Sequence, residues 1–138
     1  MGANTWQIGN DANWTSTVKV TSNSNLVKLG SGKVTWGAAN TNTGYTTVSE
    51  GELAVNNSGK LGTGKLTVAK DATFSGVNTS AKPLENSSIE INGTLRPGSY
   101  NGAFTGTLYF GGKNVTLSQT GTYLISAYKV ATSSSNIS

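Results

Sequence analysis

The side chains that could carry out chemistry are few in this chain of 138 residues. It has no His and no Cys, which excludes the usual nucleophile–base pairs, disulfides and thiolate metal sites. Six carboxylates remain, and Glu50 and Glu52 flank Gly51. Paired carboxylates can cleave a glycosidic bond or bind calcium. Two solvated acids beside a turn glycine are the simpler interpretation, so we expect a non-enzymatic protein with no catalytic residue, cofactor or metal.

Aromatic side chains are the other candidates, because an exposed ring can stack on a sugar. Tyr45, Tyr100 and Tyr109 are the candidate ligand contacts, in predicted turns or at outward strand positions. Trp6 and Trp14 could form a similar platform near the N-terminus. We expect these two tryptophans instead to cap the end of a solenoid, because an open end must be covered for the protein to stay soluble.

The charge of the chain does not indicate a nucleic-acid partner. The net charge of +4 comes from nine lysines and Arg96. These residues are scattered, and no basic patch with interleaved aromatic rings emerges. Solvated lysines that keep strand edges apart explain the charge better.

Short apolar-x-apolar triplets recur along the chain and must position any of these side chains. Gly, Asn, Ser and Thr separate the triplets and break longer elements. Side chains alternate along a strand, so the outer residues of a triplet would face a core and the middle residue water. One predicted column holds residues 27–29, 46–48, 66–68, 89–91 and 108–110, and the other holds residues 34–36, 53–55, 72–74, 94–95 and 115–117.

Members of a column lie about 19 to 23 residues apart, as in solenoid repeats. Stacked in register, they predict an all-β, right-handed parallel β-helix of about five coils over residues 26–130, with the repeat best from 27 to 74. Residues 1–25 are expected to form an N-terminal cap of short strands, and residues 131–138 a frayed tail. Residues 75–88 are predicted to be a projecting loop. An antiparallel sandwich also has short alternating strands and remains the alternative.

The repeat also resembles a known family. Residues 37–48 (GAANTNTGYTTV) and 51–55 (GELAV) are similar to the autotransporter-associated β-strand repeat, as are residues 57–68 (NSGKLGTGKLTV). Residues 92–98 (NGTLRPG) resemble a turn found further along such passengers. The match is specific from residue 30 to residue 74 and looser from 89 to 125.

The resemblance implies a β-helical passenger, secreted to or displayed on a bacterial surface, and it implies no reaction. We expect a structural or adhesive segment of a longer protein whose parent is anchored in the outer membrane by a barrel domain that this chain lacks. Expected partners are host or bacterial surface glycans or proteins, or a second copy bound through coil ends, and not nucleic acid. The competing hypothesis is a carbohydrate-binding β-module that uses the exposed aromatic residues.

Overall fold

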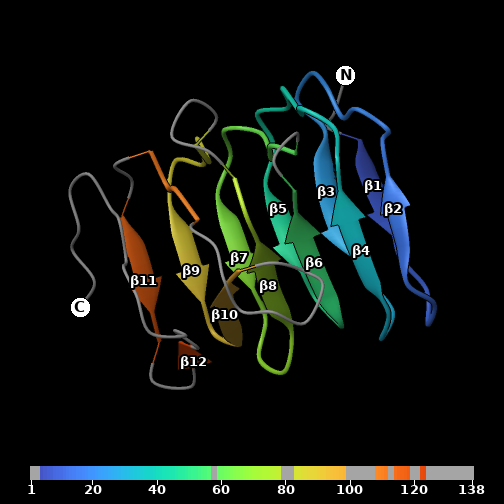
Figure 1. The fold of residues 1–138 in the computed structure, drawn as a ribbon. Helices are drawn as coiled ribbons and strands as arrows, with labels where there is room; N and C mark the ends of the chain where they lie inside the picture. The colour runs from blue at the N-terminus through green and yellow to red at the C-terminus, as the bar shows by residue number, and fades with distance from the viewer. Residues whose placement is uncertain are drawn as a thin grey trace.

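The computed structural model describes residues 4–56, 59–78, 83–98, 108–111, 114–118 and 122–123. These residues form a parallel β-solenoid of about four turns, with no helix among them. Its strands are β1 (Thr5–Ile8), β2 (Trp14–Ser16), β3 (Asn25–Lys28), β4 (Lys33–Trp36), β5 (Thr46–Val48), β6 (Glu52–Val55), β7 (Leu66–Val68), β8 (Thr73–Gly76), β9 (Ile89–Ile91), β10 (Thr94–Pro97), β11 (Val115–Leu117) and β12 (Thr122–Tyr123) (Figure 1).

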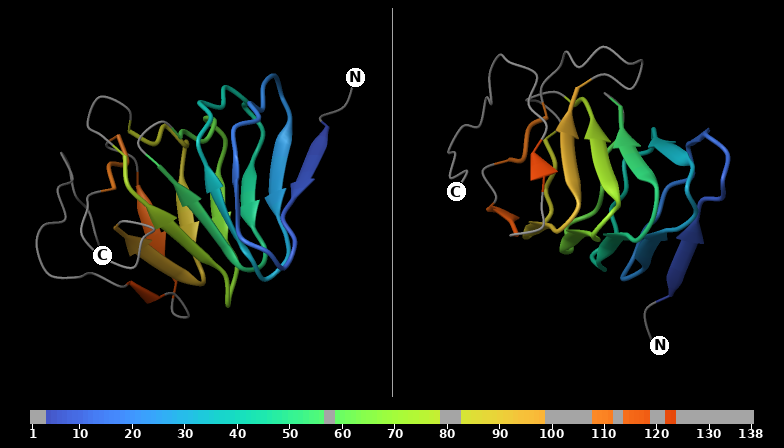
Figure 2. Two further views of the ribbon diagram at one scale, coloured as in Figure 1. Left: turned by 45° about the vertical axis from the view of Figure 1, so that its right-hand side comes forward. Right: turned by 90° about the horizontal axis from the view of Figure 1, so that it is seen from below.

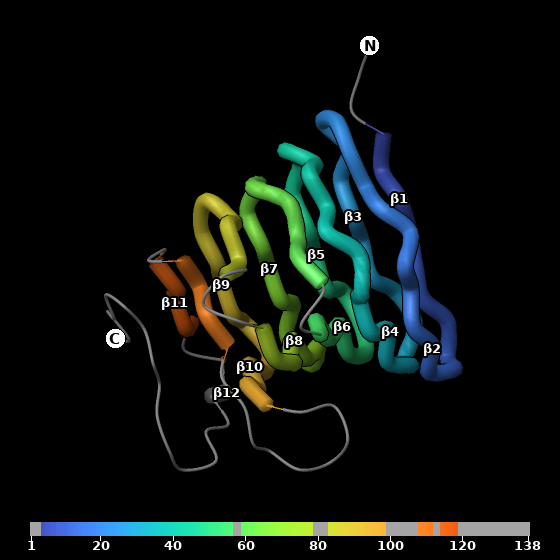
Figure 3. The backbone as a smooth tube through the Cα atoms, turned by 45° about the horizontal axis from the view of Figure 1, so that its top comes forward, coloured from blue at the N-terminus to red at the C-terminus, as the bar shows by residue number. Residues whose placement is uncertain are grey.

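The strands stack into two six-stranded sheets. The odd sheet runs in the order β1-β3-β5-β7-β9-β11, and the even sheet in the order β2-β4-β6-β8-β10-β12. Every pair of neighbouring strands is parallel. The two sheets form two layers, and the chain winds from β1 and β2 at one end towards β11 at the other (Figures 2 and 3). The predicted β-helix is therefore confirmed, and the antiparallel sandwich is wrong.

Inward-facing residues of the two sheets form one continuous core. In the odd sheet Leu26, Thr46, Leu66 and Ile89 are stacked in register. In the even sheet the equivalent stack consists of Val34, Leu53, Phe74 and Leu95. All eight residues are at most 1% exposed. No single turn could enclose these side chains, so the stacking of neighbouring turns creates the core.

Asparagines stabilise the third side of the solenoid, between the even sheet and the next odd strand. The buried Asn42 donates from Nδ2 to the carbonyl oxygen of Ser24, one turn earlier, over 2.9 Å. The buried Asn86 donates in the same way to Gly64, also over 2.9 Å. These side-chain bonds add to backbone bonds between the same turns, such as that from the amide of Thr63 to the carbonyl of Asn42 over 2.9 Å, so each turn is tied to the one before it.

The predicted register of the first triplet is wrong by one residue. Residues 27–29 were expected to place Lys28 in water, but β3 pairs Leu26 with Thr46 and Lys28 with Val48. Lys28 is fully buried, whereas Val27 is only half-buried. A slip of one residue turns every side chain to the other face, and burial of Leu26 against its neighbouring turns decides the register.

Two triplets near the C-terminus were assigned to the wrong place. Residues 115–117 were predicted to share a column with residues 34–36. They form β11, which pairs with β9 and therefore belongs to the odd sheet. Residues 108–110 form no strand; the carbonyl of Tyr109 accepts a hydrogen bond from the amide of Leu84 over 2.9 Å. The two triplets have the same apolar pattern, and the longer connection after β10 removes the constant spacing that would distinguish them.

The triplet at residues 72–74 is shifted by two positions relative to the prediction. Phe74 pairs with Leu53, and Gly76 pairs with Val55 at the inward position that follows. The expected projecting loop is also partly wrong, because Ser75 and Gly76 belong to β8 and Leu84 is fully buried.

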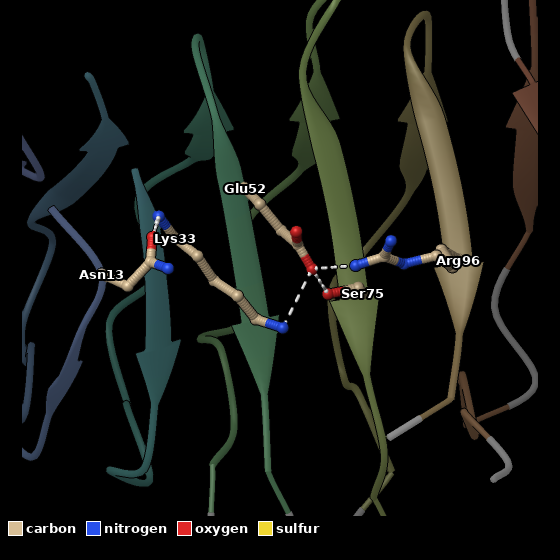
Figure 4. A network of polar contacts seen from close by, with 5 residues as sticks. All are labelled: Asn13, Lys33, Glu52, Ser75 and Arg96. Carbon is tan, nitrogen blue, oxygen red and sulfur yellow. Dashed lines mark hydrogen bonds and ion pairs between the residues drawn. The ribbon is translucent and has the colours of Figure 1, made fainter. Parts of the chain in front are cut away.

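Outward-facing residues at the middle of the even-sheet strands are buried, contrary to the prediction for Thr35 and Ala54. Thr35, Ala54 and Ser75 are 8%, 0% and 2% exposed. They are small residues among longer ones, and the side chains of Glu52 and Arg96 meet beside Ser75 (Figure 4). The middle residues of the odd sheet follow the prediction better, since Thr47, Thr67 and Glu90 are half-buried and Thr116 is exposed.

The N-terminal segment forms the first turn of the solenoid. β1 and β2 each extend one of the two sheets, by pairing with β3 and β4. Residues 18–20 lie within the predicted cap of short strands but form no strand. The predicted tail at residues 131–138 lies outside the described residues.

Candidate functional site

A polar constellation of four side chains runs across the outer face of the even sheet. Lys33 on β4, Glu52 on β6, Ser75 on β8 and Arg96 on β10 come from four successive turns (Figure 4). We call these four residues the Glu52 cluster. The in-register stacking of the strands brings Glu52 and Arg96, which lie 44 residues apart in sequence, into direct contact.

One carboxylate oxygen holds the Glu52 cluster together. Glu52 Oε1 lies 2.7 Å from Arg96 Nη2 and 3.3 Å from Lys33 Nζ. The hydroxyl of Ser75 donates a hydrogen bond to the same oxygen. At the edge of the cluster, the side-chain oxygen of Asn13 accepts from the amide of Lys33 over 2.8 Å.

The electrostatics of the Glu52 cluster favour the ionised carboxylate. Burial alone would raise the pKa of Glu52, but the hydrogen bond from Ser75 and the charges of Lys33 and Arg96 outweigh it and hold the pKa below its ordinary value. A carboxylate whose pKa is lowered in this way is a poor general acid or base near neutral pH. The Glu52 cluster is suited to holding turns of the solenoid together.

A second polar row crosses the outer face of the odd sheet. Tyr45, just before β5, is 46% exposed, and its amide donates to Asn25 Oδ1 over 3.0 Å. On the following turns Lys65 Nζ and Glu90 Oε2 form an ion pair of 2.6 Å. Hydrogen bonds from Lys65 and Asn92, together with the charge of Lys65, lower the pKa of Glu90. We call Asn25, Tyr45, Lys65 and Glu90 the Tyr45 row.

The three predicted tyrosine contacts are not brought together. Tyr45 is exposed on the odd sheet. Tyr109 is half-buried on the third side, where its amide donates to Asn78 Oδ1 over 2.6 Å and its carbonyl accepts from Asn78 Nδ2 over 2.9 Å. Tyr100 lies outside the described residues. Of these three tyrosines, Tyr45 is the one shown to be exposed.

The buried Lys28 was missed by sequence reasoning. Its ammonium group donates to the carbonyl oxygens of Leu29, Gly30 and Glu50 over 2.6, 2.8 and 3.2 Å. Burial lowers the pKa of Lys28, although Glu50 and Asp11 act in the opposite direction. The sequence feature that could have revealed it is the position of Leu26. Leu26 lies twenty residues before Thr46 and begins an apolar-x-Lys triplet, so that Lys28 aligns with Val48.

A shallow, open depression of about 480 Å³ lies on the third side, lined by Thr63, Pro83, Glu85, Ser87 and Gly111. Glu85 forms an ion pair with Lys60. Hydroxyl groups and one carboxylate line the depression, without an aromatic side chain in its described wall.

The Glu50 and Glu52 side chains have different surroundings. Glu50 is exposed, whereas Glu52 is held in its cluster. Across the described ranges, no three acidic side chains gather as a metal ion would require. Nor do these ranges contain a helix that is long and apolar enough to span a membrane. Comparison of the chain with protein-family models, curated proteins and solved structures gives no match.

Proposed function

We propose that this chain is a non-enzymatic structural and adhesive segment, a rigid β-solenoid stalk whose faces serve as contact surfaces. The supporting observation is the Glu52 cluster. Its ion pairs link turns along the solenoid, because the carboxylate of Glu52 contacts both Lys33 and Arg96 on other turns. Such a cluster adds cross-turn attachment to the backbone ladders, which is what a stalk needs in order to resist bending and fraying.

The resemblance of residues 30–74 to the autotransporter-associated β-strand repeat is the basis for proposing where the stalk is located. On that basis we propose a passenger segment that is secreted by a bacterium or displayed on its surface, within a longer protein anchored in the outer membrane. Its partners would be glycans or proteins of host or bacterial surfaces.

The proposal is tested by measuring adhesion with the purified chain. Beads carrying the chain, attached through an added terminal tag, should retain epithelial or bacterial cells more strongly than beads carrying an unrelated β-rich protein. Small-angle X-ray scattering should show an elongated particle. Equal retention by both kinds of bead would contradict the adhesive part, and turnover of a polysaccharide by the chain would contradict the non-enzymatic part.

A carbohydrate-binding module is the second candidate, favoured by the Tyr45 row. The exposed ring of Tyr45 lies one turn from Asn25 and one turn from Lys65, so a ring for stacking has polar groups on both sides. A glycan array should then show binding that Tyr45→Ala abolishes. Thr47→Ala, on the same strand, is the control and should leave binding intact. An array without reproducible binding would leave the stalk as the better proposal.

A further inference from the structure

A short segment on the third side of the solenoid, from Pro83 to Ser87, alternates between the core and the surface. Leu84 and Asn86 are 0% exposed. Glu85 and Ser87 are exposed, and Pro83 is half-buried. Successive side chains of an extended chain point to opposite sides. Pro83, Glu85 and Ser87 therefore project from the same outer surface, while the two residues between them anchor the segment.

Hydrogen bonds to the turns on both sides hold this segment in place. The amide of Ser87 donates to the carbonyl oxygen of Thr63, on the turn before, over 2.7 Å. The amide of Leu84 donates to the carbonyl oxygen of Tyr109, on the turn after, over 2.9 Å. A backbone fixed in this way presents its side chains with little further loss of conformational entropy when a ligand binds.

The three projecting side chains line the depression of about 480 Å³, together with Thr63 and Gly111. Sites for small ligands commonly have volumes of about 300 to 1,000 Å³. At Gly111, where φ is 59°, a Cβ would lie 2.8 Å from the carbonyl oxygen of Leu84. Glycine at this position therefore keeps one edge of the depression free of a side chain.

The charges beside the depression cancel. Glu85 forms an ion pair with Lys60, and the two side chains are 46% and 26% exposed. The carboxylate can accept further hydrogen bonds, and the hydroxyls of Thr63 and Ser87 can both donate and accept. The ring of Pro83 adds an apolar surface. These groups match a ligand that has many hydroxyl groups, a face of C–H groups and no net charge.

We propose that this depression binds a short neutral oligosaccharide. Sugar hydroxyl groups donate to the carboxylate of Glu85 and exchange hydrogen bonds with Thr63 and Ser87. The C–H face of one sugar ring lies against Pro83. An acidic sugar gains little here, because the adjacent ammonium group is already paired. The proposal rests on the adhesive part of the proposed function, for which it names a ligand class, and its site is separate from the Tyr45 row on the odd sheet.

The test is an NMR titration of the whole chain, labelled with nitrogen-15, with maltotriose, cellotriose and mannotriose. At least one of these neutral trisaccharides should shift the backbone amide signals of Thr63, Glu85 and Ser87. The shifts should saturate with a Kd of roughly 1 mM, because an open site makes few contacts. Trigalacturonic acid is the acidic probe and should bind about tenfold more weakly than the best neutral trisaccharide.

Substitutions at the depression separate a binding role from a structural one. Glu85→Ala should raise the Kd for the neutral trisaccharide about tenfold, because a charged acceptor is lost. It also leaves the ammonium group of Lys60 unpaired, so the affinity for trigalacturonic acid should rise, which a loss of structure alone would not produce. Ser87→Ala should weaken only the neutral ligand. Glu50→Ala, at an exposed acid between β5 and β6, is the matched control and should leave both Kd values unchanged.

Three results would each overturn the proposal: no saturable shift with any of the neutral trisaccharides, equal binding of the acidic probe, or binding that Tyr45→Ala abolishes and Glu85→Ala leaves intact. Circular dichroism shows whether each variant is folded. Cell retention by beads is measured with the same variants. Retention without trisaccharide binding overturns this site alone, whereas trisaccharide binding without retention contradicts the adhesive function alone.

Discussion

Replacement of Lys28 by Met tests how this solenoid accommodates a charge in its core. The side chain is 0% exposed, and its ammonium group donates to three backbone carbonyls at the corner between β3 and β4. Methionine keeps most of the apolar stem and removes the donor. We therefore expect Lys28→Met to fold into the same solenoid with a lower free energy of unfolding.

The magnitude follows from two opposing contributions. A buried polar group that loses its partner costs about 1 to 3 kcal/mol, and Lys28 serves three carbonyl oxygens, two of them at 2.8 Å or less. Removal of a buried ammonium group recovers part of its desolvation penalty. Because the partners are neutral carbonyls, no uncompensated charge remains. We expect a net loss of about 1 to 3 kcal/mol.

The pH dependence provides a second signature. Burial places the pKa of folded Lys28 below its ordinary value of 10.5. Between the lowered pKa and 10.5 the unfolded chain binds more protons than the folded one, so the contribution of this group to stability rises with pH in that window. Lys28→Met should lack this rise.

Urea unfolding followed by circular dichroism, at several pH values up to 10.5, measures both effects. Val48→Met is the matched control because Val48 is the register partner of Lys28 and is also 0% exposed. It tests the fit of methionine in this column without removing a donor. A Lys28→Met variant as stable as the unaltered chain, or one with an unchanged alkaline slope, would refute the reasoning.

Two further substitutions test the other contacts. Glu52→Gln should cost about 1 to 2 kcal/mol; because the pKa of Glu52 is lowered, its contribution is present above its ordinary pKa of 4.5 and is lost as the pH falls through the folded pKa. Acid unfolding curves should thus be flatter for Glu52→Gln, whereas Glu50→Gln, at an exposed site, should match the unaltered chain. Gly76→Ala should destabilise by about 2 kcal/mol or more, because φ is 122° and a Cβ would lie 2.0 Å from the carbonyl oxygen of Val55. Thermal unfolding measures this loss against Gly37→Ala, where the nearest atom would be the side-chain nitrogen of Asn56 at 3.2 Å. Equal effects of Gly76→Ala and Gly37→Ala would contradict the steric argument.

Local patterning was sufficient to predict the architecture. The triplets at residues 34–36, 53–55, 66–68 and 89–91 alternate between core and outer face, and turn residues prevent longer strands from forming. Their near-constant spacing required that like residues stack. A parallel solenoid follows because none of these short strands can bury its apolar side chains without the next turn.

The polar contacts depended on information that is absent from any single turn. The pattern around Lys28 permits two registers one residue apart, and burial of Leu26 against the neighbouring turns selected one of them. The Glu52 cluster depends on the strand register in several turns, and these turns differ in length. Nineteen residues separate Lys33 from Glu52, and twenty-one separate paired residues of β8 and β10. Alternation in the sequence determined that these turns would stack; the tertiary structure decided which side chains meet, because packing between turns sets the register of each strand.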